Sequence, residues 1–97
     1  MLCYHIAVCD DKSVETKYLS ELASHWAGER GLAVQIDTFA SAEQLLLRYR
    51  QEGNYDMLLL DIEMDGISGV ELAKRIRAGN KIVQIVFVTG YSDYILD

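Results

Sequence analysis

The sequence predicts an α/β fold in which helices cover both faces of a doubly wound parallel β-sheet. Two nearly continuous apolar segments, 57–60 and 82–89, are typical of strands that are buried on both faces. Helical patterns alternate with the strand-like segments in the order βαβαβαβ, which is characteristic of parallel sheets. Helices on both faces require the sheet to wind in two directions, so we expect the strand order 2-1-3-4. The chain has no proline and no linker, and we expect one domain, 1–97.

Composition and charge exclude several classes of protein. The chain is 51% hydrophobic and 25% charged, which argues against disorder. Its net charge of −6 disfavours binding of nucleic acid or anionic lipid through this segment and is compatible with a divalent cation. No apolar run approaches the roughly 18 residues of a membrane span, so we expect a cytoplasmic protein. Cys3 and Cys9 stand roughly 20 Å apart on one expected strand and should be reduced core residues.

The first strand and the first helix are expected at the N-terminus. The strand, Cys3–Cys9, is mostly apolar and ends at the acidic pair Asp10–Asp11. We interpret its polar residue, His5, as a core histidine with a partner. From Lys12 the apolar spacing becomes helical, and the helix should end at a glycine between 28 and 31. Its buried face is expected to carry Val14, Tyr18, Leu22 and Trp26, with Leu19 and Ala23 beside them.

A second strand and a second helix follow. Val34–Phe39 alternates apolar and polar residues, as expected of a strand nearer the sheet edge. Ser41 opens the helix, because Gln44 stands three residues later in a capping-box spacing, and Gly53–Asn54 ends it. Its inner face is expected to carry Ala42, Leu45, Leu46 and Tyr49.

The central strand is expected at Tyr55–Asp61, with a carboxylate at its C-terminal end. Ser68 and Glu71 repeat the capping-box spacing at the start of a third helix. Its apolar stripe should comprise Val70, Ala73 and Ile76. Ile82–Thr89 is expected to form a fourth buried strand, and Tyr91–Asp97 has the pattern of a further helix.

Four polar side chains follow the ends of the first, third and fourth strands: Asp10, Asp11, Asp61 and Thr89. These strands are neighbours in a 2-1-3-4 sheet, about 4.8 Å apart, so the side chains should converge. Carboxylates about 4 Å apart repel by roughly 4 kcal/mol at an effective dielectric of about 20, so the cluster favours a cation. Oxygen ligands alone favour Mg²⁺. Asp11 alone could instead cap the first helix, which is compatible with a metal role.

A carboxylate beside a bound cation can act as a nucleophile toward a phosphoryl group, with a hydroxyl such as that of Thr89 donating to a phosphoryl oxygen. In the arrangement of these residues, the sequence resembles the receiver domain of two-component response regulators, a CheY-like domain with a flavodoxin-like fold. The matching features are the Asp10–Asp11 pair, LLLD ending at Asp61, the DGISG loop, and VFVTGYS around Thr89. The segments LLLDIEMDGISGVELAKRIR and FVTGYSDYILD look most like regulators with a LytTR-type DNA-binding output domain.

The resemblance implies a phosphoacceptor domain rather than an enzyme. Its implied partner is a sensor histidine kinase, and its implied output is a transcriptional domain outside this segment. The implied site comprises Asp61 as phosphoacceptor, Thr89 as switch hydroxyl beside the small Gly90, and Mg²⁺ ligands from Asp11, Asp61, the backbone carbonyl of Glu63 and, through water, Asp10.

The sequence departs from the family in two ways. Asp65 follows Met64, where the family often has a proline, and this adds a negative charge near the site. A receiver should continue through the rest of helix four, a fifth strand that carries a lysine, and a fifth helix, and all three are missing from these 97 residues. Lys74 and Lys81 are expected on and just past the third helix, so neither replaces that lysine. Relative to the family, the chain is therefore expected to be truncated at its C-terminus.

Two other functions remain open at this point. One is a receiver-like interaction module that no longer switches. The other is a phosphatase of the haloacid dehalogenase type, although Asp61–Ile62–Glu63 lacks the second aspartate of a DxD motif. The apolar segment IVFV, left as a sheet edge, also predicts self-association as a homodimer or by exchange of terminal elements.

Overall fold

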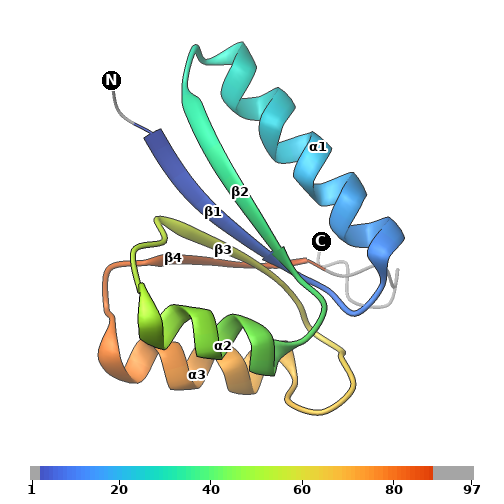
Figure 1. The fold of residues 1–97 in the computed structure, drawn as a ribbon, viewed down its shortest axis with the longest axis vertical. Helices are drawn as coiled ribbons and strands as arrows, with labels where there is room; N and C mark the ends of the chain where they lie inside the picture. Colours follow the sequence, from blue (N-terminus) through green and yellow to red (C-terminus); the bar gives the residue numbers. More distant parts are fainter. Residues whose placement is uncertain (1–2, 89–97) are drawn as a thin grey trace, which may run out of the picture.

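In the computed structural model, residues 3–88 form a four-stranded parallel sheet with helices on both of its faces (Figure 1). The strands are β1 (Cys3–Cys9), β2 (Ala33–Phe39), β3 (Met57–Asp61) and β4 (Gln84–Val88). The helices are α1 (Ser13–Glu29), α2 (Ala42–Gln51) and α3 (Gly69–Gly79). The expected helix at Tyr91–Asp97, together with Thr89 and Gly90, lies outside the described residues.

The strand order is β2-β1-β3-β4, and every neighbouring pair is parallel, which confirms the expected topology. Cys9 lies opposite Leu60, and Asp61 lies opposite Val88, so the C-terminal ends of the three strands are level to within about one residue. Because parallel strands end at a common edge, the loops after β1 and β3 open on the same side of the sheet.

The two faces of β1 support two separate layers of core. Ile6 and Val8 pack with Leu19 and Ala23 of α1 on one face. Successive side chains of a strand alternate between faces, so Ala7 and Cys9 belong to the other layer. That layer contains the buried side chains of α2 and α3, among them Leu45, Leu46, Leu72 and Ile76. Burial of each such leucine contributes about 2 kcal/mol relative to an exposed one.

Two side-chain caps begin the second and third helices as expected. The Ser41 hydroxyl accepts a hydrogen bond from the Gln44 backbone N–H at 3.2 Å, and Ser68 accepts one from Glu71 at 3.1 Å. Such caps satisfy N–H groups that have no partner within the helix, and each typically contributes about 1 kcal/mol.

The prediction for the buried face of α1 is confirmed for Leu19 and Ala23 but is wrong for its main stripe, Val14, Tyr18, Leu22 and Trp26. Val14 and Tyr18 are 76% and 59% exposed, and Leu22 and Trp26 also reach solvent, at 52% and 37%. The residues that are buried are Leu19, Ala23 and Ala27. Small alanine side chains allow the helix backbone to approach the sheet closely, so the larger apolar side chains lie beside this contact line.

Several other residues are less buried than expected. Val86 and Phe87 of β4 are 39% and 44% exposed, because β4 is an edge strand within residues 3–88. The prediction of a fully buried fourth strand is therefore wrong for this part of the chain. Cys3 and Val70 are also exposed, and both cysteines are free thiols.

A polar cluster joins β1, β2 and the residue pair that precedes β3. The His5 Nε2 atom lies 2.9 Å from Asp37 Oδ2, which confirms the prediction of a partnered histidine. The Tyr55 hydroxyl donates a hydrogen bond to the same Asp37 oxygen at 2.7 Å. The centroids of the His5 and Tyr55 rings lie 4.2 Å apart. Burial raises the pKa of the Tyr55 phenol, and its hydrogen bond to Asp37 raises that pKa further.

Candidate functional site

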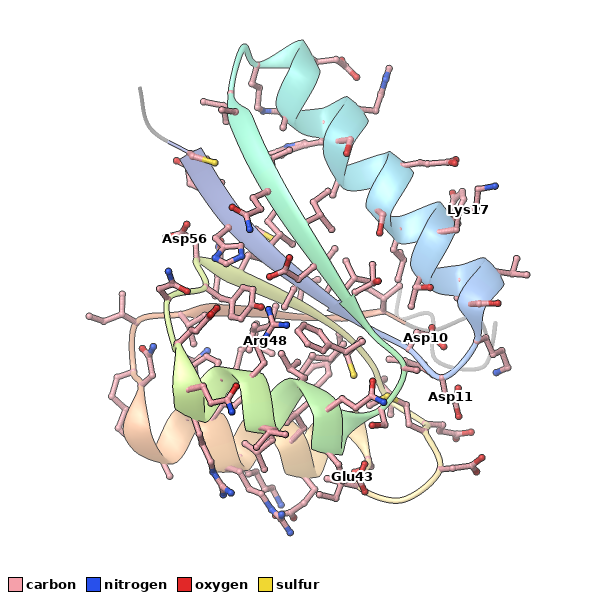
Figure 2. The ribbon with its side chains drawn as sticks, in the orientation of Figure 1. Asp10, Asp11, Lys17, Glu43, Arg48 and Asp56 are labelled. Atoms are coloured by element: carbon pink, nitrogen blue, oxygen red, sulfur yellow. The ribbon has the colours of Figure 1, made fainter. Side chains whose placement is uncertain are left out.

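Three carboxylates converge at the C-terminal edge of the sheet. Asp10 follows β1 directly, Asp11 comes next, and Asp61 is the last residue of β3. One oxygen from each lies within 4.8 Å of the others. Asp10 and Asp61 are 6% and 4% exposed, whereas Asp11 reaches solvent. Figure 2 shows Asp10 and Asp11 together where the chain leaves β1 for α1. The strand ends therefore bring together the three acids, as the topology predicts.

The electrostatics of this cluster favour a bound cation. Burial raises the pKa of Asp61, and the charges of Asp10 and Asp11 raise it further, while Lys12 and the Glu63 backbone N–H lower it. Burial likewise raises the pKa of Asp10, although the Lys12 backbone N–H donates to its Oδ1 at 3.0 Å. Ionising all three groups together is costly, and a hard divalent cation with oxygen ligands would relieve that repulsion. The donor set therefore fits Mg²⁺.

Asp11 contacts the loop after β3 and does not cap α1. The N-cap of α1 is Lys12, without a side-chain cap, so the interpretation of Asp11 as the cap of this helix is wrong. Its Oδ2 instead accepts a hydrogen bond from the Asp65 backbone N–H at 3.2 Å. Asp11 therefore links the loop after β1 to the loop after β3.

Gly69 fixes the position of the strand end that carries Asp61. A Cβ atom on Gly69 would overlap the backbone carbonyl oxygen of Asp61. The Gly69 N–H also donates to the Ile62 carbonyl at 3.0 Å. The start of α3 thus lies directly against the backbone of Asp61, an approach that only glycine permits. In the sequence, Gly69 stands out only as the last residue of the DGISG loop motif, because nothing local reveals the close approach.

The Cys9 thiol lies beneath the acidic cluster. It is fully buried, and its Sγ contacts the Met64 sulfur at 3.6 Å. Burial is the largest cause, with the negative charges of Asp10 and Asp61 next, of a pKa of Cys9 that is raised to about 12. The thiol therefore stays protonated near neutral pH and packs as a small apolar side chain in the hydrophobic core.

The remaining expected site residues are Glu63 and Thr89. Glu63 lies in the loop directly after Asp61, and its backbone N–H bonds to the Asp61 carboxylate. Thr89 lies outside the described residues, immediately after the β4 residue that is paired with Asp61.

The fold and the acidic cluster together define a class: parallel α/β domains with a carboxylate pocket at the C-terminal edge of the sheet. Comparison with known families is more specific. The model of the response regulator receiver domain matches residues 6–96, and the chain belongs to this family.

Curated relatives agree with this assignment. Transcriptional regulatory protein NatR of Bacillus subtilis is 33% identical over 89 residues, which cover 92% of this chain and 36% of that protein. Sensory transduction protein LytT of Oceanobacillus iheyensis is 33% identical over 92 residues, which cover 93% of this chain and 35% of that protein. The chain spans about a third of the length of these relatives.

Solved structures give the same family. Response regulator protein TrrA of Thermotoga maritima, in complex with Mg²⁺ and BeF, is 40% identical with a TM-score of 0.70, and the match covers 94% of this chain and 73% of that chain. A complex of TrrA with histidine kinase ThkA matches at 36% identity and a TM-score of 0.66, over 97% of this chain and 75% of that chain.

These comparisons confirm that the chain is a receiver domain of a two-component response regulator with LytT-type relatives. Receivers are signalling modules, so the family assignment decides against a phosphatase of the haloacid dehalogenase type. Among residues 3–88, none of the helices has the length and apolar character needed to cross a bilayer.

Proposed function

We propose that Asp61 accepts a phosphoryl group from the phosphohistidine of a sensor kinase, with Mg²⁺ held at the same pocket. The proposed metal ligands are Asp10, Asp11, Asp61 and the backbone carbonyl of Glu63. The observation that carries this proposal is the convergence of three carboxylate oxygens within 4.8 Å, two of them on buried side chains.

For the phosphoryl transfer, the chain needs to supply an Asp61 carboxylate that is correctly positioned and ionised. An Asp61 carboxylate oxygen forms a bond to phosphorus while the P–N bond of the phosphohistidine breaks, and the imidazole nitrogen keeps the electron pair. Mg²⁺ would neutralise charge on the phosphoryl oxygens and favour ionised Asp61. The Glu63 N–H already stabilises that ionised form. We assign the Thr89 hydroxyl the role of donor to a phosphoryl oxygen.

The phosphoryl group would carry a charge of about −1.5 to −2, but it would replace the −1 of the ionised Asp61 carboxylate, so the pocket would become more negative by about one unit or less. The added negative charge would act most directly on the Asp11 carboxylate, which lies in the acidic cluster and also accepts a hydrogen bond from the Asp65 backbone N–H. We propose that the change is passed to an output domain outside this segment, of LytTR type, which would bind DNA. The net charge of −6 gives this segment itself little attraction for nucleic acid. A cytoplasmic location belongs to the same proposal, since both thiols are free.

Self-association is a second proposal, and a specific surface supports it. A groove of about 390 Å³ lies between α1 and the sheet. Its lining is apolar and includes Leu22, Trp26, Met57, Leu59, Val86 and Val88. Edge strands beside exposed apolar surface favour pairing between copies. A domain that associates through this groove without accepting phosphate would be an interaction module rather than a switch.

A small phosphodonor distinguishes these functions. Incubation with acetyl phosphate and Mg²⁺ should add the mass of one phosphoryl group to the chain, and Asp61→Asn should remain unmodified. Asp65→Asn is the matched control, because Asp65 is an exposed acid in the loop after β3 and its backbone N–H is retained. An unmodified wild-type chain with every donor would leave only the interaction module.

A further inference from the structure

The loop between β3 and α3, residues 62–68, is held by two carboxylates, one from the loop after β1 and one from α2. On one side, Asp11 Oδ2 accepts the Asp65 N–H at 3.2 Å. On the other side, Glu43 Oε2 accepts the Ile67 N–H at 3.4 Å. Glu43 stands in the first turn of α2, well away in sequence from both the loop and the acidic cluster. Figure 2 shows Asp11 and Glu43 on the side of the molecule where this loop runs.

The contact between Glu43 and the loop is also steric. Gly66 has a φ of +79°, and a Cβ atom there would lie 2.6 Å from Glu43 Oε2. The absence of a side chain on Gly66 lets the Glu43 carboxylate lie against the loop backbone and reach the next amide. The close approach at Gly66 and the hydrogen bond at Ile67 involve consecutive residues, so both belong to one contact between Glu43 and the loop.

We propose that Glu43 is a positioning residue for the metal pocket, and this rests on the proposed function of Asp61. Glu43 lies outside the acidic cluster and acts through the loop that follows Asp61. By holding Gly66 and Ile67 against α2, it keeps the backbone of Glu63 and Asp65 in place beside the pocket.

The reason that a second anchor is needed lies in Asp11. Asp11 is both a proposed metal ligand and the partner of the Asp65 N–H, so its orientation must serve two contacts. The Gly69 N–H bond to the Ile62 carbonyl holds the ends of the loop, but residues 65–67, if tied only by Asp11, would lose order whenever that carboxylate turned toward a cation. The Glu43 contact holds the loop independently of the metal, which lowers the entropy cost of forming the complete ligand set.

Magnesium titration of the whole chain by calorimetry tests this role. Glu43→Ala should raise the dissociation constant for Mg²⁺ roughly 2- to 10-fold, the range expected for loss of one hydrogen bond. Glu43→Gln keeps an acceptor oxygen and should stay within about twofold of wild type. Glu52→Ala is the matched control, because Glu52 lies about 14 Å away at the other end of α2 and should bind Mg²⁺ like wild type.

Hydrogen exchange gives a readout that is specific to the contact. In Glu43→Ala the Ile67 amide should exchange faster, while the Gln44 amide, capped by Ser41, should keep its protection. Unchanged Mg²⁺ affinity in Glu43→Ala would overturn the positioning role. Equal weakening in Glu43→Gln and Glu43→Ala would also overturn it, since charge alone would then explain the effect. If wild type binds no Mg²⁺, the proposed function itself fails, which is a different result.

Discussion

The first residue of α3, Gly69, lies so close to the carbonyl oxygen of Asp61 that any side chain there would overlap it. This contact ties the start of a helix to the last residue of the central strand. Together with the hydrogen bond from the Gly69 N–H to the Ile62 carbonyl, it explains in physical terms how the backbone of Asp61 is held in place.

Replacement of Gly69 by alanine tests this relationship. The overlap must be relieved by a backbone shift at Asp61, which should cost about 1–3 kcal/mol and lower the melting temperature by several degrees. The variant should also bind Mg²⁺ more weakly. Gly79→Ala in the same helix is the control, because a Cβ there meets no neighbour within 4 Å, and it should be neutral or stabilising. Equal melting temperatures for the two variants would refute the account of Gly69.

Magnesium should stabilise the folded chain. Because the cation binds the folded carboxylate cluster, a concentration of ten times the dissociation constant should add about 1.4 kcal/mol of stability. Asp11→Asn should lose most of this shift in a thermal melt. In chelator the same variant should be at least as stable as wild type, because the Asp11 charge contributes to the raised pKa values of Asp10 and Asp61, after burial. Identical wild-type melts in Mg²⁺ and in chelator would contradict the metal site.

The polar cluster around Asp37 predicts a loss of stability in acid. Burial alone would raise the pKa of Asp37, but hydrogen bonds from Tyr55 and His5 outweigh it, and the net shift is downward. A carboxyl whose pKa is lowered by folding stabilises the folded state above its unfolded pKa of about 3.9, and that stability is lost as pH falls through the folded pKa.

Asp37→Asn should therefore cost about 1–3 kcal/mol at pH 7 and progressively less as the pH falls below about 3.9, as measured by urea unfolding at each pH. Asp56→Asn is unsuitable as a control, since Asp56 accepts the His5 N–H. The exposed Asp65 serves instead, and Asp65→Asn should show no such pH dependence. A cost for Asp37→Asn that is constant across this pH range would argue against the cluster as its source.

The apolar groove that the described residues form beside α1 predicts self-association, which a single charge placed in the groove should weaken. The wild-type chain should sediment as a species larger than a monomer at tens of micromolar. Leu22→Lys places a charge in the groove and should shift the population toward monomer. Leu47→Lys is the matched control, because Leu47 is a similarly exposed leucine, 62% accessible, on α2 and outside this groove. A wild-type monomer over the same range would rule out the self-association proposal.

The sequence predicted the fold well because its strongest signals are local. The apolar run that ends at Asp61 and the Ser41 and Ser68 caps mark element ends directly, and the alternation of strands and helices restricts the topology. Convergence of Asp10, Asp11 and Asp61 then follows from strand order alone. The orientation of α1 could not be predicted, because the stripe from Val14 to Trp26 and the line of Leu19, Ala23 and Ala27 are both apolar.

The contacts that position the candidate site were also beyond sequence reasoning. The Glu43 contact with Gly66 and the Gly69 contact with Asp61 depend on the path of one loop between two elements. No spacing in the sequence relates an acid in the first turn of α2 to a loop more than twenty residues later. These contacts can be identified only when the three-dimensional path of residues 62–68 is known.

Locating the phosphoryl group on the chain tests the central claim most directly. After treatment with acetyl phosphate and Mg²⁺, borohydride reduction of the acyl phosphate followed by peptide mass mapping should mark Asp61 alone. The account predicts no mark in chelator and none in Asp61→Asn. A mark on Asp10, Asp11 or another residue of the wild-type chain, or modification that persists in Asp61→Asn, would contradict it.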